Sequence, residues 1–471
     1  MRKRRNLTKT ALLLVVMALV AAACAGDAAN QTPETVVVTS IVTETVTETV
    51  TETVEVEVPM ADPFADTAVT VFGPESGGAE EEAMRAALDL FAAKSGIDVT
   101  YLGARDFSDQ INAQAAGGNP PDIAVFPQPG KIADFAREGF ILPLPSETEA
   151  VMNDNFSSAW TAFGNVDGVQ YAIPTKADLK SLVWYQPARF AAAGYTVPET
   201  WDDLLSLTDT MIADGNTPWC VGIESGGATG WTFTDWVEDL TLRFEGPEYY
   251  DQWVDHSIPF NNPQMASIWQ TVLDLWNTPG AVFANSGSIA ATSFGDNGQP
   301  LVDGKCFMHR QASFYSAFLP EGTPAADGSE GAVDVFYFPS VGDEKPVLGA
   351  GTLVSAFRDA PEVWAVMEYF ASADYADARQ RFQALGKGAA VTEGVLSGFL
   401  SPNVNADLSL YAPLEQSFLD ILNTADIVRF DGSDLMPSEV GAGTFWTEGT
   451  SAVNGDKTIQ EALDAIEASW P

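Results

Sequence analysis

The chain has 471 residues, of which 46% are hydrophobic, 65 are acidic and 23 are basic. This length exceeds what one hydrophobic core usually organises, so two domains are expected, and the hydrophobic fraction is large enough to build their cores. The acidic excess would repel nucleic acid and anionic lipid headgroups, which argues against polyanionic partners. It favours a neutral or cationic ligand, or simply a very soluble surface.

The first residues have the pattern of an export signal. A basic segment, MRKRRNLTKT, is followed by the apolar run ALLLVVMALV and by small residues before Cys24. The run is too short for a membrane-spanning helix. The alanines at 21–23 resemble the bacterial lipobox, although Ala21 stands where leucine is usual. Residues 1–23 are therefore predicted to be a lipoprotein signal peptide and Cys24 to carry the lipid. Ordinary cleavage with a free Cys24 thiol is the alternative.

Residues 24–65 are predicted to be the lipid anchor and a disordered tether. They contain the repeat TETVTETVTETVEVEV, and no aromatic residue occurs among them before Phe64. Such a composition cannot bury a core. A flexible coil of about 35 residues has a root-mean-square reach of roughly 30–35 Å. We therefore expect an exported globular body held at the outer face of the cell membrane, where it captures a solute or a partner.

From Ala68 onward, predicted strands alternate with predicted helices. The strands are expected at 68–73, 97–102 and 122–126, and helices at 79–96 and 107–118 lie between them. This alternation is typical of a parallel sheet. Ligands of such sheets bind beyond the carboxyl ends of the strands. The candidate residues at these ends are Glu75, Ser76, Arg105, Asp106, Phe126 and Gln128, although each alone could be a helix cap or a turn residue.

A glycine-rich stretch, PWCVGIESGGATGWTFTDW, gathers three tryptophans between residues 218 and 236. The flat apolar face of an indole suits the C–H face of a pyranose, and glycine allows close approach of the backbone. Taken singly, a tryptophan is more often a core or interface residue. The cluster nevertheless predicts a sugar platform in which Trp231 and Trp236 stack on the ligand.

Several phrases resemble a known family. NPPDIAVFPQPG and VPETWDDL, with a loop of the SGGAE type, resemble the extracellular solute-binding proteins of bacterial ABC importers, in the carbohydrate-binding group related to maltose-binding proteins. KADLKSLVWY, PWCVGIESGGATGW, TDWVED and KCFMHRQASF are similar to the α-glucoside-binding proteins within that group. The resemblance covers roughly Ala68 to the C-terminus.

The resemblance implies an α/β fold of two lobes, each a sheet flanked by helices, with hinge crossings between them. A sugar would bind between the lobes, which close on it by hinge motion and deliver it to an ABC permease. The first lobe is expected to comprise residues 66–173 and 338–390. The second is expected to comprise 174–337 and a helical tail, 391–471. The protein would be a monomeric receptor without catalysis or a cofactor.

Polar residues complete the predicted site, because sugar hydroxyls demand many directed donors and acceptors. Glu75, Arg105, Asp106 and Gln128 would serve from one lobe. Lys180, Arg310 and Gln311 would serve from the other. The GAGT phrase at 349–352 is read as a turn of close approach, which adds Gly351.

With Cys24 assigned to lipid, Cys220 and Cys306 remain. An even pair in an exported protein is more often bridged than free, and the family resemblance strengthens that pairing. Two buried reduced thiols are the alternative. A bridge would fix the tryptophan stretch against the CFMHRQASF segment.

The sequence contains few residues or motifs that indicate catalysis. The chain has only two histidines, His256 and His309, so no metal site is expected, and GxSxG, HExxH and GxxxxGK[ST] do not occur. Paired carboxylates leave one rival, because Asp235 with Glu238 or Asp106 could serve an anchored glycoside hydrolase. A binding protein for a non-sugar solute is the third possibility.

Overall fold

The computed structural model describes residues 37–39, 53–55, 64, 66–326, 328–385 and 395–471. They fall into two compact units, Met1–Pro63 and Phe64–Pro471. The predicted signal peptide, Cys24 and the lobe boundary expected between residues 390 and 391 lie outside the described residues. Within the tether, β1 (Val37–Thr39) pairs antiparallel with β2 (Thr53–Glu55), so these six residues are extended and paired where a disordered spacer was expected. Their valines and threonines suit strands.

In the larger unit, the first sheet contains six strands. Along the sheet the order is β15 (Val428–Phe430), β14 (Val347–Ala356), β5 (Ile123–Phe126), β3 (Ala68–Gly73) and β4 (Asp98–Gly103), and β8 (Ile173–Leu179) also pairs with β14. β3 runs parallel to β4 and β5, as the strand–helix alternation predicted, whereas β14 runs antiparallel to β5 and β8. The carboxyl ends of β3, β4 and β5 therefore meet at one edge of the sheet.

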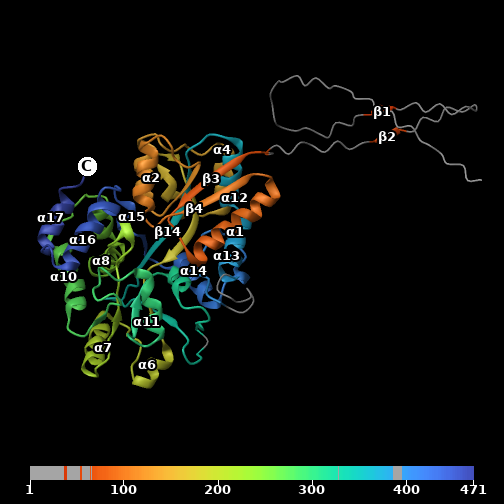
Figure 1. Ribbon diagram of the computed structural model, residues 1–471. Helices are drawn as coiled ribbons and strands as arrows, with labels where there is room; N and C mark the ends of the chain where they lie inside the picture. Colours follow the sequence, from red (N-terminus) through yellow and green to blue (C-terminus); the bar gives the residue numbers. More distant parts are fainter. Residues whose placement is uncertain (1–36, 40–52, 56–63, 65, 327, 386–394) are drawn as a thin grey trace, which may run out of the picture. The chain divides into compact units, whose positions relative to one another are not determined.

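Helices cover this sheet. They are α1 (Gly78–Ser95), α2 (Phe107–Ala116), α3 (Pro129–Arg137), α4 (Ser146–Asn155), α12 (Pro361–Ala371) and α13 (Ala373–Leu385). α1 buries a stripe of Ala83, Met84, Ala87 and Leu88 and ends at Gly96, which has a φ of 77°. Its stripe at helical spacing is the one the sequence indicates. Figure 1 shows α1 and α13 side by side, and residues of the two helices are in contact.

The second sheet has five strands, in the order β11 (Val282–Phe283), β10 (Trp219–Cys220), β12 (Met308–Arg310), β9 (Leu182–Tyr185) and β13 (Asp334–Tyr337). Its helices include α7 (Trp201–Ala213), α8 (Trp231–Phe244), α10 (Pro263–Asn277), α16 (Trp446–Asn454) and α17 (Ile459–Glu467). The two sheets with their helices form the two lobes of a periplasmic-binding-protein-like fold. The remaining helices are α5 (Ser158–Thr161), α6 (Pro187–Ala193), α9 (Pro247–Val254), α11 (Gly298–Val302), α14 (Pro413–Thr424) and α15 (Gly432–Leu435).

Two strands lie outside the lobe ranges expected from the sequence. β8 pairs with β14 of the first sheet, although the boundary was expected between residues 173 and 174. β15 also pairs with β14, although it falls inside the helical tail expected to belong to the second lobe. All seven residues of β8 are buried. A strand with a continuous run of buried residues is expected inside a sheet whose two faces are both covered, and pairing with β14 places β8 there. Of the later tail helices, α16 contacts α8 and α17 contacts α10.

A disulfide links Cys220 and Cys306, whose Cα atoms are 5.5 Å apart. Cys220 lies on β10 and Cys306 stands just before β12, and these two strands are neighbours in the second sheet. Both cysteines are buried. The predicted pairing is confirmed, and the bridge joins the start of the tryptophan stretch to the segment that carries His309 and Arg310.

Candidate functional site

A cavity of about 200 Å³ opens between the two lobes. The first lobe contributes residues that follow strands of its sheet, including Glu75, Ser76, Arg105 and Gln128, together with Lys176 and Asp178 of β8 and Gly351 of β14. The second lobe contributes Ser225, Trp231, Phe294, Phe314 and Phe318. The segment after β15 adds Asp431, Ser433, Asp434 and, further on, Trp446. The wall therefore combines aromatic faces with charged and amide groups.

Where the lobes meet beside the cavity, they approach closely at Gly227. This residue lies in the short 3₁₀ helix η2 (Gly226–Ala228) of the second lobe, which contacts α2 of the first. A Cβ atom placed on Gly227 would stand 2.8 Å from Asp109 Oδ2. The next atom is Asp106 Cβ at 3.4 Å, so a small side chain at Gly227 requires Asp109 to move and a large one requires η2 and α2 to separate.

Ion pairs organise the wall of the first lobe around Lys176. Its Nζ lies 2.9 Å from Glu80 Oε1 and 3.5 Å from Glu75 Oε1. Burial lowers the pKa of Lys176, but the carboxylates of Asp178, Glu80 and Glu75 outweigh burial and raise it. Arg379 of α13, which is not among the residues that line the cavity, also pairs with Glu75, and its Nη2 lies 2.8 Å from Oε2. These charges are therefore fixed before any ligand arrives.

Of the acidic side chains near Lys176, Asp178 lies farthest from this cation. Its closest cation is Lys176, with Nζ 3.9 Å from Oδ1, and Oδ1 has no hydrogen-bond partner among the described residues. Burial raises the pKa of Asp178 to about 7, and the attraction of Lys176 opposes the rise. An acceptor atom is thus available at the cavity.

On the other side, Lys180 is held by two carboxylates. Its Nζ lies 2.7 Å from Asp235 Oδ1 and 2.5 Å from Asp431 Oδ2, and it stands 5.5 Å from the centre of the Trp231 ring. Asp431 is the N-terminal cap of α15, where its side chain accepts a hydrogen bond from the backbone N–H of Asp434. A negative group at a helix N-terminus is favourable. Lys180 thereby joins the chain between β8 and β9 to α8 and α15.

The structure brings seven predicted site residues to the cavity: Glu75, Ser76, Arg105, Gln128, Lys180, Trp231 and Gly351. Trp231 is half-buried and exposes part of its ring there. Gly351 has a different reason for lacking a side chain, because a Cβ would meet the backbone carbonyl of Lys176 on the neighbouring strand. The close approach at Gly351 is between β14 and β8.

Five predicted residues do not line the cavity. Asp106 is exposed at the start of α2 and accepts a hydrogen bond from Gln110. Phe126 lies in the core against Phe107 and Phe135. Arg310 is paired with Asp239 at 2.8 Å and with Asp235 at 3.4 Å. Gln311 is buried, and its side chain accepts a hydrogen bond from the backbone of Ala312. The fifth residue is Trp236.

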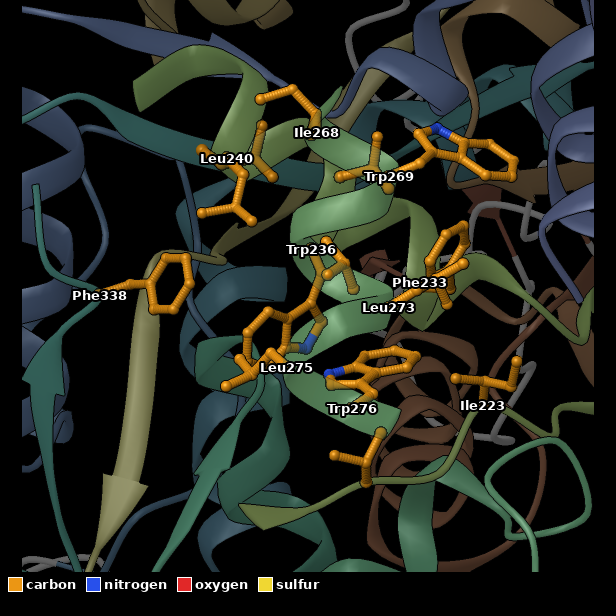
Figure 2. Close-up of a cluster of buried hydrophobic side chains, with 14 of the residues drawn as sticks. Ile223, Phe233, Trp236, Leu240, Ile268, Trp269, Leu273, Leu275, Trp276 and Phe338 are labelled. Carbon is orange, nitrogen blue, oxygen red and sulfur yellow. The ribbon is translucent and has the colours of Figure 1, made fainter. Parts of the chain in front are cut away.

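Trp236 fails to reach the cavity because the tryptophan stretch ends in a helix. α8 begins at Trp231, and five residues along a helix turn a side chain by about 140°, so Trp236 points to another face. There it packs edge to face against Trp219, Trp276 and Phe338. Figure 2 shows it enclosed by apolar side chains of the second-lobe core.

Sequence reasoning missed part of the wall, and for some residues a signal existed. Lys176, Asp178 and Lys180 alternate in KADLK, and alternate residues of a strand share one face. Recognising 173–179 as a buried strand would have assigned Lys176 and Asp178, the two that were missed, to one side of it. The aromatic residues Phe294, Phe314, Phe318 and Trp446 carry no comparable pattern.

The carboxylate pair considered for a hydrolase is not in the cavity. Asp235 and Glu238 are both buried in α8. Asp235 is engaged by Lys180 and Arg310, and Glu238 accepts hydrogen bonds from the backbone N–H groups of Gly432 and Ser433. Burial raises the pKa of Glu238 well above its usual range. The pair thus fixes α8 to α15.

Residues 76–377 match the family of bacterial extracellular solute-binding proteins. The chain belongs to this family. It is 39% identical over 409 residues to the osmoprotective compounds-binding protein GgtB of Synechocystis sp., covering 86% of this chain and 92% of that one. It is 37% identical over 418 residues to the alpha-glucosides-binding periplasmic protein AglE of Rhizobium meliloti, covering 85% and 86%. This is a family of solute receptors rather than of enzymes.

Solved structures agree on the fold of this solute-binding protein. The bacterial solute receptor AcbH superimposes with a TM-score of 0.70 at 16% identity, covering 86% of this chain and 97% of that one. A chitin oligosaccharide binding protein gives a TM-score of 0.70 at 18% identity, covering 86% and 98%. The described part of the chain holds no helix with the length and apolar character needed to cross a membrane. Nor do its His, Cys, Asp and Glu residues form a cluster suited to a metal ion.

Proposed function

We propose that this solute-binding protein is a lipid-anchored receptor that binds an α-glucoside or a related small oligosaccharide and delivers it to an ABC importer. The observation that carries the proposal is the composition of the cavity. Trp231 and three phenylalanines offer apolar faces, while Glu75, Gln128 and Asp178 offer hydrogen-bonding groups from the opposite lobe. A pyranose needs both, because its C–H faces are apolar and its edge carries hydroxyls.

The size of the cavity favours a small ligand. At about 200 Å³ it is smaller than the roughly 300–1,000 Å³ typical of pockets for drug-sized molecules. The name of the Rhizobium relative supports an α-glucoside. The name of the Synechocystis relative supports a second candidate, a small osmoprotective solute.

Measurements of binding and of hydrolysis distinguish a sugar receptor from a receptor for another osmoprotective solute and from a glycoside hydrolase. The mature full-length protein is titrated by calorimetry with glucose, maltose, maltotriose, sucrose, trehalose and glycine betaine, and each mixture is then assayed for released reducing sugar. We expect at least one α-glucoside to bind and to remain intact. Binding of glycine betaine alone would favour the second candidate, and release of reducing sugar would support the hydrolase. Failure of every sugar to bind would refute the sugar assignment.

The anchor is tested separately. Cys24 follows the export pattern and precedes the tether, which supports lipidation. Two acyl chains give stable membrane attachment where one chain is marginal. Intact-mass analysis of the protein from the membrane fraction is expected to show a chain that starts at Cys24 and carries diacylglycerol. A mature chain without lipid, or one that starts elsewhere, would remove the anchor from the proposal.

A further inference from the structure

The acidic residues of the cavity wall differ in how close the nearest cation lies. Three of them lie close to a cation: Glu75 is 2.8 Å from Arg379, Glu80 is 2.9 Å from Lys176, and Asp431 is 2.5 Å from Lys180. Two are not so supported. Asp434 forms no ion pair with any described residue, and Asp178 has only Lys176 at 3.9 Å. The cavity is therefore lined by five acidic side chains and three basic ones, Arg105, Lys176 and Lys180.

Of these two residues, Asp178 is the one with a buried oxygen atom that lacks a hydrogen-bond partner. It is 7% exposed, it lines the cavity, and its Oδ1 accepts no hydrogen bond in the described part of the chain. Lys176 cannot turn fully toward it, because the same ammonium group is held by Glu80 at 2.9 Å. A buried carboxylate oxygen without a donor is costly. A donor on the ligand would remove that cost.

A second acceptor lines the same cavity. Gln128 is 5% exposed, and its Oε1 likewise accepts no hydrogen bond within the described ranges. Its side chain is already engaged with Asp434. On the first-lobe side, Glu75, Glu80 and Asp178 stand beside Lys176 and Arg379, and Arg105 also lines the cavity. Asp178 Oδ1 and Gln128 Oε1 are thus two buried acceptors that hydrogen-bond donors of a ligand could satisfy.

We propose that the part of the cavity beside Asp178 is a subsite for a protonated amine, so that an amino-substituted α-glucoside is a preferred ligand. This inference rests on the proposed function of the same cavity. An ammonium group supplies three donors and a positive charge, whereas a hydroxyl supplies one donor and no charge. Charge-assisted hydrogen bonds are roughly twice as strong as neutral ones. A carboxylate or phosphate placed beside an ionised Asp178 would instead face like charge.

The test compares ligands that differ only in one group. Methyl α-D-glucopyranoside is titrated into the mature protein beside its four analogues in which one hydroxyl, at C2, C3, C4 or C6, is replaced by an amino group. One analogue is expected to bind at least about tenfold more tightly than the neutral parent, because one amine position will meet Asp178. The others report what an amine does elsewhere in the cavity.

The variant Asp178→Asn keeps the shape of the side chain and removes its ability to ionise. It is expected to bring the ratio of amine to parent affinity down to about one. Asp89→Asn removes an exposed carboxylate on α1 and is the matched control, in which the ratio should stay at its original value. The ratio is the readout, so a general weakening of sugar binding in Asp178→Asn does not imitate the effect.

Each outcome decides the proposal. If the parent binds and none of the four amines binds more tightly, the amine subsite is wrong and the proposed sugar receptor stands. Persistence of the preference in Asp178→Asn would also overturn the assignment to Asp178. If neither the parent nor any larger α-glucoside binds, the proposed function fails and this inference fails with it.

Discussion

Lys180 donates a hydrogen bond from Nζ to Asp235 Oδ1 at 2.7 Å, and this contact ties the crossing between β8 and β9 to the helix that presents Trp231. The same ammonium group reaches Asp431, the cap of α15. All three side chains are buried. Lys180 therefore connects three segments that are far apart in the sequence, and it does so at the wall of the cavity.

Lys180→Met is expected to destabilise the fold by about 3–5 kcal/mol, because it leaves two buried carboxylates without their cation. Urea unfolding of the ligand-free protein measures this loss. The matched control is Lys457→Met, which breaks a partly exposed pair with Glu448 and should cost less than about 1 kcal/mol. Equal, small losses in both variants would show that the buried pairs do not stabilise the fold.

Much of the first lobe was predictable because its strands and helices show in the hydrophobic pattern of short stretches of sequence. The strand–helix alternation from Ala68 gave β3, α1, β4, α2 and β5. The rule that ligands bind beyond the carboxyl ends of parallel strands then led to Glu75 and Gln128. Both residues line the cavity.

The rest of the site depends on pairings that the sequence does not reveal locally. Asp178 and Asp431 reach one cavity because β8 and β15 both pair with β14. Trp236 was misassigned because the glycine-rich stretch was treated as one platform, whereas α8 begins at Trp231. Only the helical period shows that Trp236 faces away from Trp231. Arg310 was expected to bind the ligand, but buried carboxylates hold it, and a partner of this kind is visible only in three dimensions.

The two tryptophans predict opposite phenotypes. Trp231→Ala is expected to weaken α-glucoside binding by about 2–4 kcal/mol, as for aromatic hot spots, with a smaller loss of stability. Trp236→Ala is expected to destabilise the fold by about 3–5 kcal/mol, because it opens a cavity among Trp219, Trp276 and Phe338. Calorimetry and urea unfolding of both variants measure the two effects. Unchanged affinity in Trp231→Ala would refute its place in the ligand platform.

The disulfide is predicted to stabilise the second lobe. The double variant Cys220→Ala with Cys306→Ala should lower the free energy of unfolding by about 2–5 kcal/mol, because the bridge closes a loop across a sequence separation of 86. Urea unfolding is compared with and without a reducing agent. The reductant should destabilise the parent and leave the variant unchanged. Equal sensitivity of the two proteins would contradict the bridge as the cause.

Gly227 is predicted to control how closely the lobes approach. Gly227→Phe places a large ring between η2 and α2, where Asp106 Cβ already lies 3.4 Å from a Cβ at this position. The ring should therefore hold the lobes apart, and ligand affinity should fall at least about tenfold. Gly342→Phe is the control, because nothing lies within 4 Å of a Cβ at that position. Titration with the same α-glucoside measures both variants. Full affinity in Gly227→Phe would show that this contact is not needed for binding.

Asp178 is predicted to make stability depend on pH. Burial raises its pKa to about 7, against about 3.9 for an unfolded aspartate. Lys176, Glu80, Lys180 and Glu75 are the charged groups that act on it. Between these two values the folded chain holds a proton that the unfolded chain has released. The contribution of Asp178 to stability is therefore present at low pH and is lost as pH rises toward 7.

Asp178→Asn removes this titration, so the comparison isolates it. The free energy of unfolding of the variant, relative to the parent, should rise by about 1.4 kcal/mol per pH unit from pH 5 to pH 7 and level off above. Urea unfolding of both proteins at pH 5, 6, 7 and 8 gives the difference, and Asp89→Asn should give a flat line. A difference that does not change with pH would mean that Asp178 is already ionised at pH 5. Its unpaired Oδ1 would then carry a full charge in the cavity throughout this range, and the proton could not be what makes its burial tolerable.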